Sequence, residues 1–238
     1  MDGGSRNEEG GIVLAKPVPL PPAPRLYLAT PLLEDPAALI GILPALLRKA
    51  DVAAVLVRLK TTDQRTMISR IKALAPAIQP SGAALLIDGH AELVARAGAD
   101  GAHLGGIEAM EDAMPSLKPD WIAGVGALPT RHDSMAAGEA GVDYVLFGEP
   151  DATGERPSVE AIAERLQWWA ELFEPPCVGY AATLDEAREF AAAGADFVLV
   201  GDLIWDDPRG PAAALLDAEA AIRQGYAEKP VQASAEQD

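Results

Sequence analysis

Short apolar segments recur along the chain, and longer segments with apolar residues at helical spacing separate them. The apolar segments are four or five residues long, which suits strands better than helices. Continuous apolar runs of this length are typical of strands buried on both faces, as in parallel sheets. We therefore predict eight strands, at residues 26–29, 53–57, 83–87, 101–104, 121–125, 144–147, 177–180 and 197–200.

Helix start signals lie in several of the intervening segments. The Asp-Pro pair at 35–36 predicts the start of the first helix, because Asp is frequent at the N-cap and Pro at the first helical position. Thr183 and Glu186 have the spacing of a capping box and predict the start of the seventh helix. A second Asp-Pro pair at 207–208 predicts the start of the eighth.

A recurring phrase gives the strongest indication of the architecture. Ala-Gly-x-Asp occurs at 97–100, 140–143 and 193–196, and an apolar run ending in glycine follows each copy. The phrase indicates a helix that ends at a C′ glycine, followed by a short loop and a buried strand. Eight strands alternating with eight helices predict a (β/α)8 TIM barrel. An open doubly wound sheet is the second candidate, and the radial repetition favours the barrel.

The ends of the chain lack this periodicity. Residues 1–24 are rich in Gly and Pro, and we predict a disordered arm there. We expect one barrel domain at 25–225 and a flexible tail at 226–238. A single domain agrees with the length of 238 residues.

Charge and cysteine content restrict partners and location. The formal net charge of -17 opposes binding to nucleic acid or to anionic membranes. No signal peptide is evident, and no apolar run reaches the roughly 18 residues of a spanning helix. A single cysteine, Cys177, excludes a disulfide within the chain and is interpreted as a packed core thiol. We therefore expect a soluble cytoplasmic protein.

Two basic residues follow the second predicted strand. Arg58 and Lys60 are two positions apart, so their side chains point to the same face of an extended chain. The working face of such a barrel lies at the carboxyl ends of the strands. Two inward cations there suit a phosphate or diphosphate. The alternative is that both lie on the rim in ion pairs with neighbouring acids.

Acidic and histidine side chains follow the next two strands. Asp88 could hold Mg²⁺, or it could be the N-cap of the following helix. Glu108 could be a second carboxylate for the metal, or a first-turn charge that favours the helix dipole. His103 lies within an apolar run, where a core histidine is the commoner finding. No zinc-type ligand spacing, phosphate-binding loop motif or nucleophile elbow is present.

These residues resemble the thiamine phosphate synthase/TenI family. The segment 25–30 is similar to the family's first strand, and 58–60 (Arg-Leu-Lys) to the end of its Gln-x-Arg-x-Lys motif. The segment 98–105 (GADGAHLG) is the most specific match, to the signature at strand four, and 193–196 resembles the approach to the last strand. The resemblance covers about residues 25–220 and implies the same barrel.

The resemblance implies a transferase of thiamine biosynthesis. The family joins an aminopyrimidine diphosphate to a thiazole phosphate with Mg²⁺ and releases diphosphate, and needs no protein nucleophile. Carried over to this chain, Arg58 and Lys60 are the catalytic cations, and Asp88 and Glu108 the metal ligands. The substrate- and phosphate-binding positions are those two cations with His103, Gly105, Gly126, Gly148, Gly179 and Gly201. The expected partners are the two small phosphorylated substrates, and an oligomer is possible.

Several family positions differ in this chain. Leu56 replaces a Gln, Gly126 replaces a Ser, and the acidic segment 149–154 replaces a Thr-x-Thr-Lys loop. Asp202 follows the expected phosphate cradle, and Leu128 replaces the His of the tautomerase branch. The synthase is therefore one hypothesis. The others are a non-catalytic barrel that binds a small ligand or partner protein, and an enzyme with an altered substrate.

Overall fold

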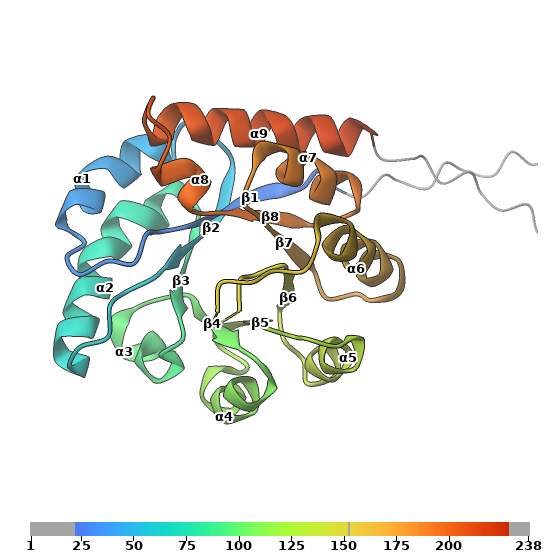
Figure 1. Ribbon diagram of the computed structural model, residues 1–238. Coiled ribbons are helices and arrows are strands. Elements are labelled where there is room, and N and C mark those ends of the chain that lie inside the picture. The colour runs from blue at the N-terminus through green and yellow to red at the C-terminus, as the bar shows by residue number, and fades with distance from the viewer. Residues whose placement is uncertain (1–21, 152, 229–238) are drawn as a thin grey trace, which may run out of the picture.

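A computed structural model describes residues 22–151 and 153–228 as one closed parallel barrel (Figure 1). Each strand pairs with its neighbours in sequence, and the last strand pairs with the first, which closes the cylinder. The predicted (β/α)8 TIM barrel is thereby confirmed, and the open sheet is excluded. The strands are β1 (Arg25–Ala29), β2 (Val52–Val57), β3 (Ala84–Asp88), β4 (Gly101–Gly105), β5 (Ile122–Gly126), β6 (Tyr144–Phe147), β7 (Cys177–Ala181) and β8 (Phe197–Val200).

Helices surround the barrel and cover the outer faces of the strands (Figure 1). The last helix continues to Glu228, three residues past the expected domain end at 225. The predictions for residues 1–21 and 229–238 lie outside the described residues. The helices are α1 (Ala37–Leu46), α2 (Gln64–Ile78), α3 (Val94–Ala97), α4 (Ile107–Leu117), α5 (Arg131–Glu139), α6 (Val159–Leu172), α7 (Leu184–Ala192), α8 (Asp202–Trp205) and α9 (Pro211–Glu228), with 3₁₀ turns η1 (Gln79–Ser81) and η2 (Ala91–Leu93).

The predicted helix starts were partly wrong. At α1 the N-cap is Pro36, one residue later than expected, although the Asp35 carboxylate accepts a hydrogen bond from the first helical N–H at 2.9 Å. Thr183 caps α7 as predicted by accepting from Glu186 N at 3.1 Å. The Asp-Pro pair at 207–208 starts no helix, because the Asp207 carboxylate forms a turn with Arg209 and α9 begins at 211.

Side chains alternate between two apolar layers. One layer fills the space between strands and helices, and the other fills the inside of the barrel. Since side chains alternate along a strand, the inward positions of β2 continue from Leu56 to residue 58, and those of β3 from Leu86 to residue 88. This alternation places the carboxyl-terminal polar residues at the mouth. The buried inner residues are Tyr27, Ala29, Leu56, Leu86, Tyr144, Leu146, Val178 and Leu199.

The aspartates of the recurring phrase have a structural role that sequence reasoning did not identify. In each copy the carboxylate accepts a hydrogen bond from a backbone N–H of the preceding strand: Asp100 from Leu85 at 2.7 Å, and the other two copies at 2.7 and 2.8 Å. The backbone N–H of each aspartate donates to the carbonyl of the same strand residue. The glycine of each copy, two residues before the aspartate, has a positive φ of 72–102°, which ends the helix as predicted. The other two pairs are Asp143 with Ala123 and Asp196 with Cys177.

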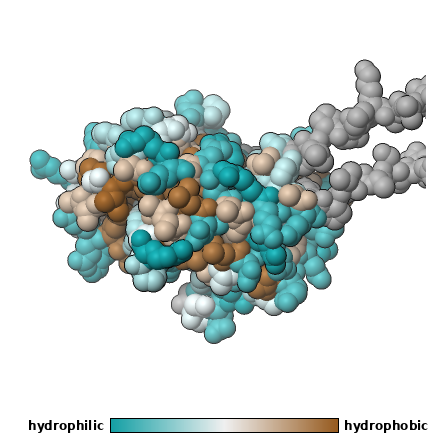
Figure 2. Space-filling model, turned by 90° about the horizontal axis from the view of Figure 1, so that it is seen from above, coloured by the Kyte–Doolittle hydropathy of each residue, from teal (hydrophilic) through white to brown (hydrophobic). Residues whose placement is uncertain are grey.

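The surface is mixed in character. Figure 2 shows the side that carries α9, where hydrophobic areas lie interspersed with hydrophilic ones. Leu216 of α9 is among the few large apolar side chains that are exposed. Within residues 22–151 and 153–228, no helix is long and apolar enough to cross a membrane.

Replacing one aspartate of the recurring phrase should destabilise the barrel. We expect Asp196→Ala to lower the free energy of unfolding by about 1–3 kcal/mol, because the buried Cys177 N–H loses a charged acceptor. Urea denaturation followed by circular dichroism measures this. The exposed Asp112→Asn is the matched control and should change stability little. Equal stability of the two variants would contradict this role.

Candidate functional site

The barrel mouth gathers side chains from the ends of several strands. Arg58 follows β2 and Asp88 ends β3, and their side chains pair with an Nε–Oδ2 distance of 3.8 Å. The backbone N–H of Arg58 donates to the hydroxyl of the buried Thr30 at 2.9 Å, which fixes the chain where it leaves the strand. Both charged side chains stay partly exposed, at 35% and 45%, so a ligand can reach them.

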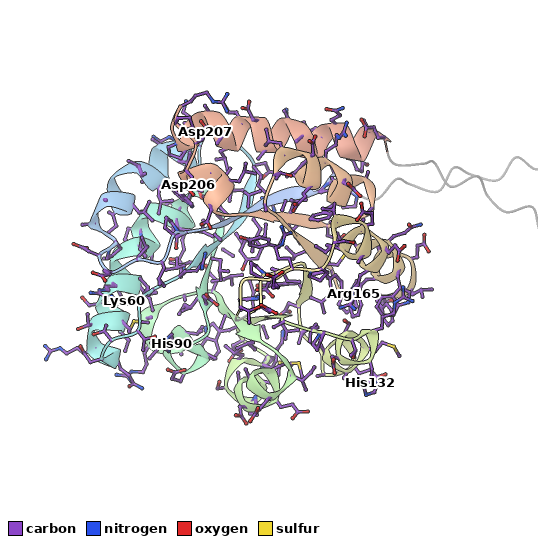
Figure 3. All side chains as sticks on the ribbon, viewed as in Figure 1. Lys60, His90, His132, Arg165, Asp206 and Asp207 are labelled. Carbon is purple, nitrogen blue, oxygen red and sulfur yellow. The ribbon has the colours of Figure 1, made fainter. Side chains whose placement is uncertain are left out.

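Lys60 lies apart from this pair. Its backbone N–H donates to Leu33 O, and its ammonium group forms an ion pair with Glu34. The Lys60 side chain is 61% exposed and lies toward the outside of the molecule rather than over the barrel centre (Figure 3). Lys60 therefore lies on the rim in an ion pair with a neighbouring acid, which is the second of the two arrangements expected for the basic residues. Arg58 is the cation that the structure places beside a carboxylate at the mouth.

A buried polar network crosses the barrel interior below the mouth. The hydroxyls of Tyr27 and Tyr144 lie 2.9 Å apart, and Tyr144 Oη lies 3.1 Å from His103 Nδ1. The other ring nitrogen, Nε2, lies 2.9 Å from Glu149 Oε1. His103 is 2% exposed and has both nitrogens engaged, as expected of a core histidine. A phosphate can contact it only if Glu149 is displaced.

Glu149 extends from the β6–α6 loop into the mouth. One carboxylate oxygen faces His103, and the other accepts a hydrogen bond from Ala127 N at 2.8 Å. Ala127 has a φ of 50°, a strained conformation for a residue with a Cβ, and this bond helps to hold it. A Cβ at Gly126 would overlap the Glu149 carboxylate, so this glycine leaves the space that the carboxylate fills.

The contact between Glu149 and His103 favours the charged form of both side chains. Burial raises the pKa of Glu149, but the charge and hydrogen bond of His103, the Ala127 N–H and the charge of Arg58 together leave it below its ordinary value. Burial lowers the pKa of His103, but the charge and hydrogen bond of the Glu149 carboxylate outweigh burial and leave this pKa above its ordinary value. The negative charge of Glu149 therefore persists at neutral pH.

A second set of contacts anchors the same loop. The Arg156 guanidinium donates to the carbonyl oxygens of Gly148 and Tyr180, both at 2.7 Å, and pairs with Glu186 at 2.9 Å. It also lies 5.0 Å from the centre of the Tyr180 ring. Glu186 also accepts from Ala182 N instead of completing the predicted capping box. The loop is thereby tied to the end of β7.

The glycines predicted to bind phosphate fall into two groups. A Cβ at Gly105 would meet nothing, and one at Gly201 would only touch Ala29, so both leave open space at the mouth. A Cβ at Gly148 would meet Ile162 of α6, and one at Gly179 would meet helix side chains at 3.0 Å. These last two positions therefore serve helix packing, and Gly148 also needs its φ of 93°.

The two predicted metal ligands do not form a preassembled site. Asp88 is at the mouth and pairs with Arg58, whereas Glu108 is exposed in the first turn of α4. In the part of the chain that the structure describes, these two carboxylates share no hydrogen bond or ion pair. No group of three or more potential metal-ligating side chains is present there either. Of the two predicted ligands, Asp88 is the one at the mouth.

Sequence reasoning missed the buried network. In the sequence, Tyr27 and Tyr144 look like ordinary strand residues of the core. Their contacts with His103 form only when the barrel closes and brings β1, β4 and β6 together around its interior. In the sequence, Glu149 stands out only as part of an acidic segment. The one available signal was its place directly after Gly148, at the end of a predicted strand.

Comparisons with known proteins find similar sequences over most of the chain. A family model described as thiamine monophosphate synthase matches residues 26–204. A thiamine-phosphate synthase of Rhodospirillum centenum is 39% identical over 202 residues, which cover 84% of this chain and 98% of that protein. A second, from Hyphomonas neptunium, is 37% identical over 203 residues, covering 82% and 91%.

Solved structures show the same fold. A thiamine phosphate pyrophosphorylase from Pyrococcus furiosus superimposes with a TM-score of 0.67 and 20% identity, covering 84% of this chain and 96% of that one. An orotidine 5'-phosphate decarboxylase from Pyrococcus horikoshii gives a TM-score of 0.61 at 15% identity, covering 83% and 99%. At these identities the likeness concerns the barrel alone.

Removing the charge of Glu149 should change the titration of His103. We expect Glu149→Gln to lower the pKa of His103, because burial then acts without the hydrogen-bonded carboxylate that opposes it. NMR of the His103 side chain in wild type and variant across pH measures this. The same pKa for His103 in both proteins would contradict the pairing.

The pair also predicts how stability depends on pH. A lowered Glu pKa stabilises the fold above the unfolded value, and a raised His pKa stabilises it below the unfolded value. The stability difference between wild type and Glu149→Gln should therefore be largest between about pH 4.5 and 6.5 and shrink on either side. Chemical denaturation across pH tests this, and a difference that is independent of pH would contradict it.

Proposed function

The chain belongs to the thiamine monophosphate synthase family, and we propose that its barrel mouth joins an aminopyrimidine diphosphate to a thiazole phosphate, releasing diphosphate. The observation that carries the proposal is the position of Arg58. It lies at the end of β2 in the motif of the family, fixed by Thr30, partly exposed, and facing the interior of the mouth. Two relatives that are 37–39% identical to this chain are named thiamine-phosphate synthase, and the matches cover 91–98% of their length.

The reaction places a specific demand on the site. The bond between the pyrimidine methylene carbon and the diphosphate oxygen breaks with its electron pair on the oxygen, and the thiazole nitrogen then attacks the carbon. The developing negative charge on the diphosphate needs preorganised cations. Arg58 offers up to five N–H donors in a planar fork, which suits phosphate oxygens. Asp88 holds this fork in place until the substrate arrives.

We propose Mg²⁺ as the companion of the diphosphate. Mg²⁺ is commonly held by one or two carboxylates together with substrate phosphates, and Asp88 is the carboxylate that the mouth offers. When bound, the ion neutralises charge on the departing diphosphate. Asp88 then serves both Arg58 and the ion, which places the two positive charges on the same side of the ligand.

The second phosphate is assigned to the end of β8. Gly201 lies there with open space above it and no bulky neighbour. Asp202 follows at the start of α8, so backbone N–H groups have to supply the favourable contacts. Gly105 offers similar open space at the end of β4. We propose a cytoplasmic location, in keeping with the single cysteine and small phosphorylated substrates.

A non-catalytic barrel of the same family is the second candidate, and one observation favours it. Arg58 and His103 at the mouth, and Lys60 on the rim, each already pair with an acidic side chain, so none of these three described residues is a free cation. A substrate with several negative charges has to compete with these acids. Such a barrel would bind a ligand without turning it over.

A direct assay separates the two functions. We expect the purified protein, incubated with both substrates and Mg²⁺, to form thiamine phosphate. Arg58→Ala should reduce kcat/KM by about 100-fold or more, because a cation that stabilises the leaving group is lost. Lys60→Ala should cause a smaller loss, because its ammonium group is held at the rim by Glu34.

Chromatography of the product and circular dichroism of each variant provide the readouts. Arg48→Ala removes an exposed arginine of the α1–β2 connection and serves as the matched control. An intact wild-type protein that forms no thiamine phosphate would reject the synthase and leave the binding barrel. An active wild type with equally active Arg58→Ala would reject the assignment of Arg58.

A further inference from the structure

The Glu149 carboxylate keeps the capacity to bind a ligand inside the mouth. One oxygen accepts from His103 and the other from Ala127 N. A carboxylate offers about four lone-pair positions, so two hydrogen bonds leave about half of them available. The Glu149 side chain is 24% exposed, so a ligand can reach it. A group that donates N–H bonds is therefore the natural partner.

We propose that Glu149 recognises the exocyclic amino group of the aminopyrimidine substrate. The inference rests on the proposed function and names the residue that selects its substrate. The amino group donates to the free lone pair of the carboxylate, and the pyrimidine ring lies in the mouth above the inner layer. The diphosphate is then directed to Arg58, whose charge acts on Glu149 across the mouth.

The surrounding positions leave this role to Glu149. Leu56 and Gly126 lie on the interior side at the ends of β2 and β5, and neither has a polar side chain. The Asp88 carboxylate is engaged with Arg58 on the diphosphate side. The missing side chain of Gly126 is what lets the Glu149 carboxylate occupy its place.

The loop that carries Glu149 is held at both sides of it. Gly148 has a φ of 93°, and its carbonyl accepts from Arg156, which also pairs with Glu186 of α7. The Glu149 carboxylate itself is fixed by two hydrogen bonds in the mouth. Rigid placement of this kind lets a single contact discriminate between ligands.

The same contact becomes stronger as the reaction proceeds. When the diphosphate leaves with its electron pair, the positive charge on the methylene carbon spreads through the ring to the amino nitrogen. The amino N–H then becomes a stronger donor, while its proton stays on the nitrogen. A hydrogen bond to an ionised carboxylate is therefore stronger in the transition state than in the ground state, which accelerates the chemical step.

Steady-state kinetics test the inference with a charge-removing and a truncating variant. We expect Glu149→Gln to lower kcat by about 10- to 100-fold, since the amide keeps an acceptor but lacks the charge. Glu149→Ala should lower kcat at least as much and raise KM for the pyrimidine diphosphate, with KM for the thiazole phosphate unchanged. Glu155→Gln makes the same change at an exposed position of the same loop and should leave the rates unaltered. Glu149 variants within twofold of wild type would overturn the inference.

Calorimetry separates a failure of this inference from a failure of the proposed function. The probes are the aminopyrimidine alcohol and its analogue with hydrogen in place of the amino group. Wild type should bind the amino form about tenfold more tightly, and Glu149→Ala should lose the preference. If wild type forms no thiamine phosphate yet shows this Glu149-dependent preference, the synthase is rejected and the recognition stands. Equal binding of both probes by wild type would overturn the recognition, as would a preference that persists in the folded Glu149→Ala variant.

Discussion

The site depends on one geometric constraint, the alternation of side chains along strands that close into a barrel. In a closed parallel barrel every second residue points inside, and the last inward residue of each strand reaches the mouth. Arg58, just after β2, therefore lies beside Asp88 of β3, and Asp88 lies beside His103 of β4. Shifting any one of these strands by a single residue would turn its polar side chain into the helix layer. The aspartates of the recurring phrase hold the strands in register at the opposite end of the barrel.

A second feature is that acids accompany the cations at the mouth. The chain carries a formal net charge of -17, so the protein as a whole does not attract phosphorylated substrates. Arg58 pairs with Asp88, and His103 with Glu149, at distances of 3.8 and 2.9 Å. These pairs hold the cations in place, but a substrate phosphate has to take over the role of the acid. The proposed Mg²⁺ would offset this local negative charge.

Glu149 connects the interior network to the substrate space. It lies at the end of a chain of polar contacts that runs through Tyr27, Tyr144 and His103 across the barrel. Within the described residues, no buried side-chain polar atom lacks a partner, so this network introduces polarity into the core without an unsatisfied group. The two positions where the family has Gln and Ser are Leu56 and Gly126, and the carboxylate of Glu149 fills the space beside Gly126. In this chain the polar group beside β5 therefore comes from the β6–α6 loop.

The sequence by itself determined the barrel and two residues of its mouth, Arg58 and Asp88. Strand periodicity, the recurring phrase and the segment 98–105 are local patterns, and local patterns suffice to predict eight strands and to place Arg58 and Asp88 at strand ends. Only the tertiary structure decided the partners of the charged groups: Lys60 pairs with Glu34, and His103 with Glu149. It also decided that Glu108 is exposed on α4, away from Asp88. The physical reason is that alternation fixes the direction of a side chain along its own strand, whereas an ion pair depends on distances between segments that only closure of the barrel brings together.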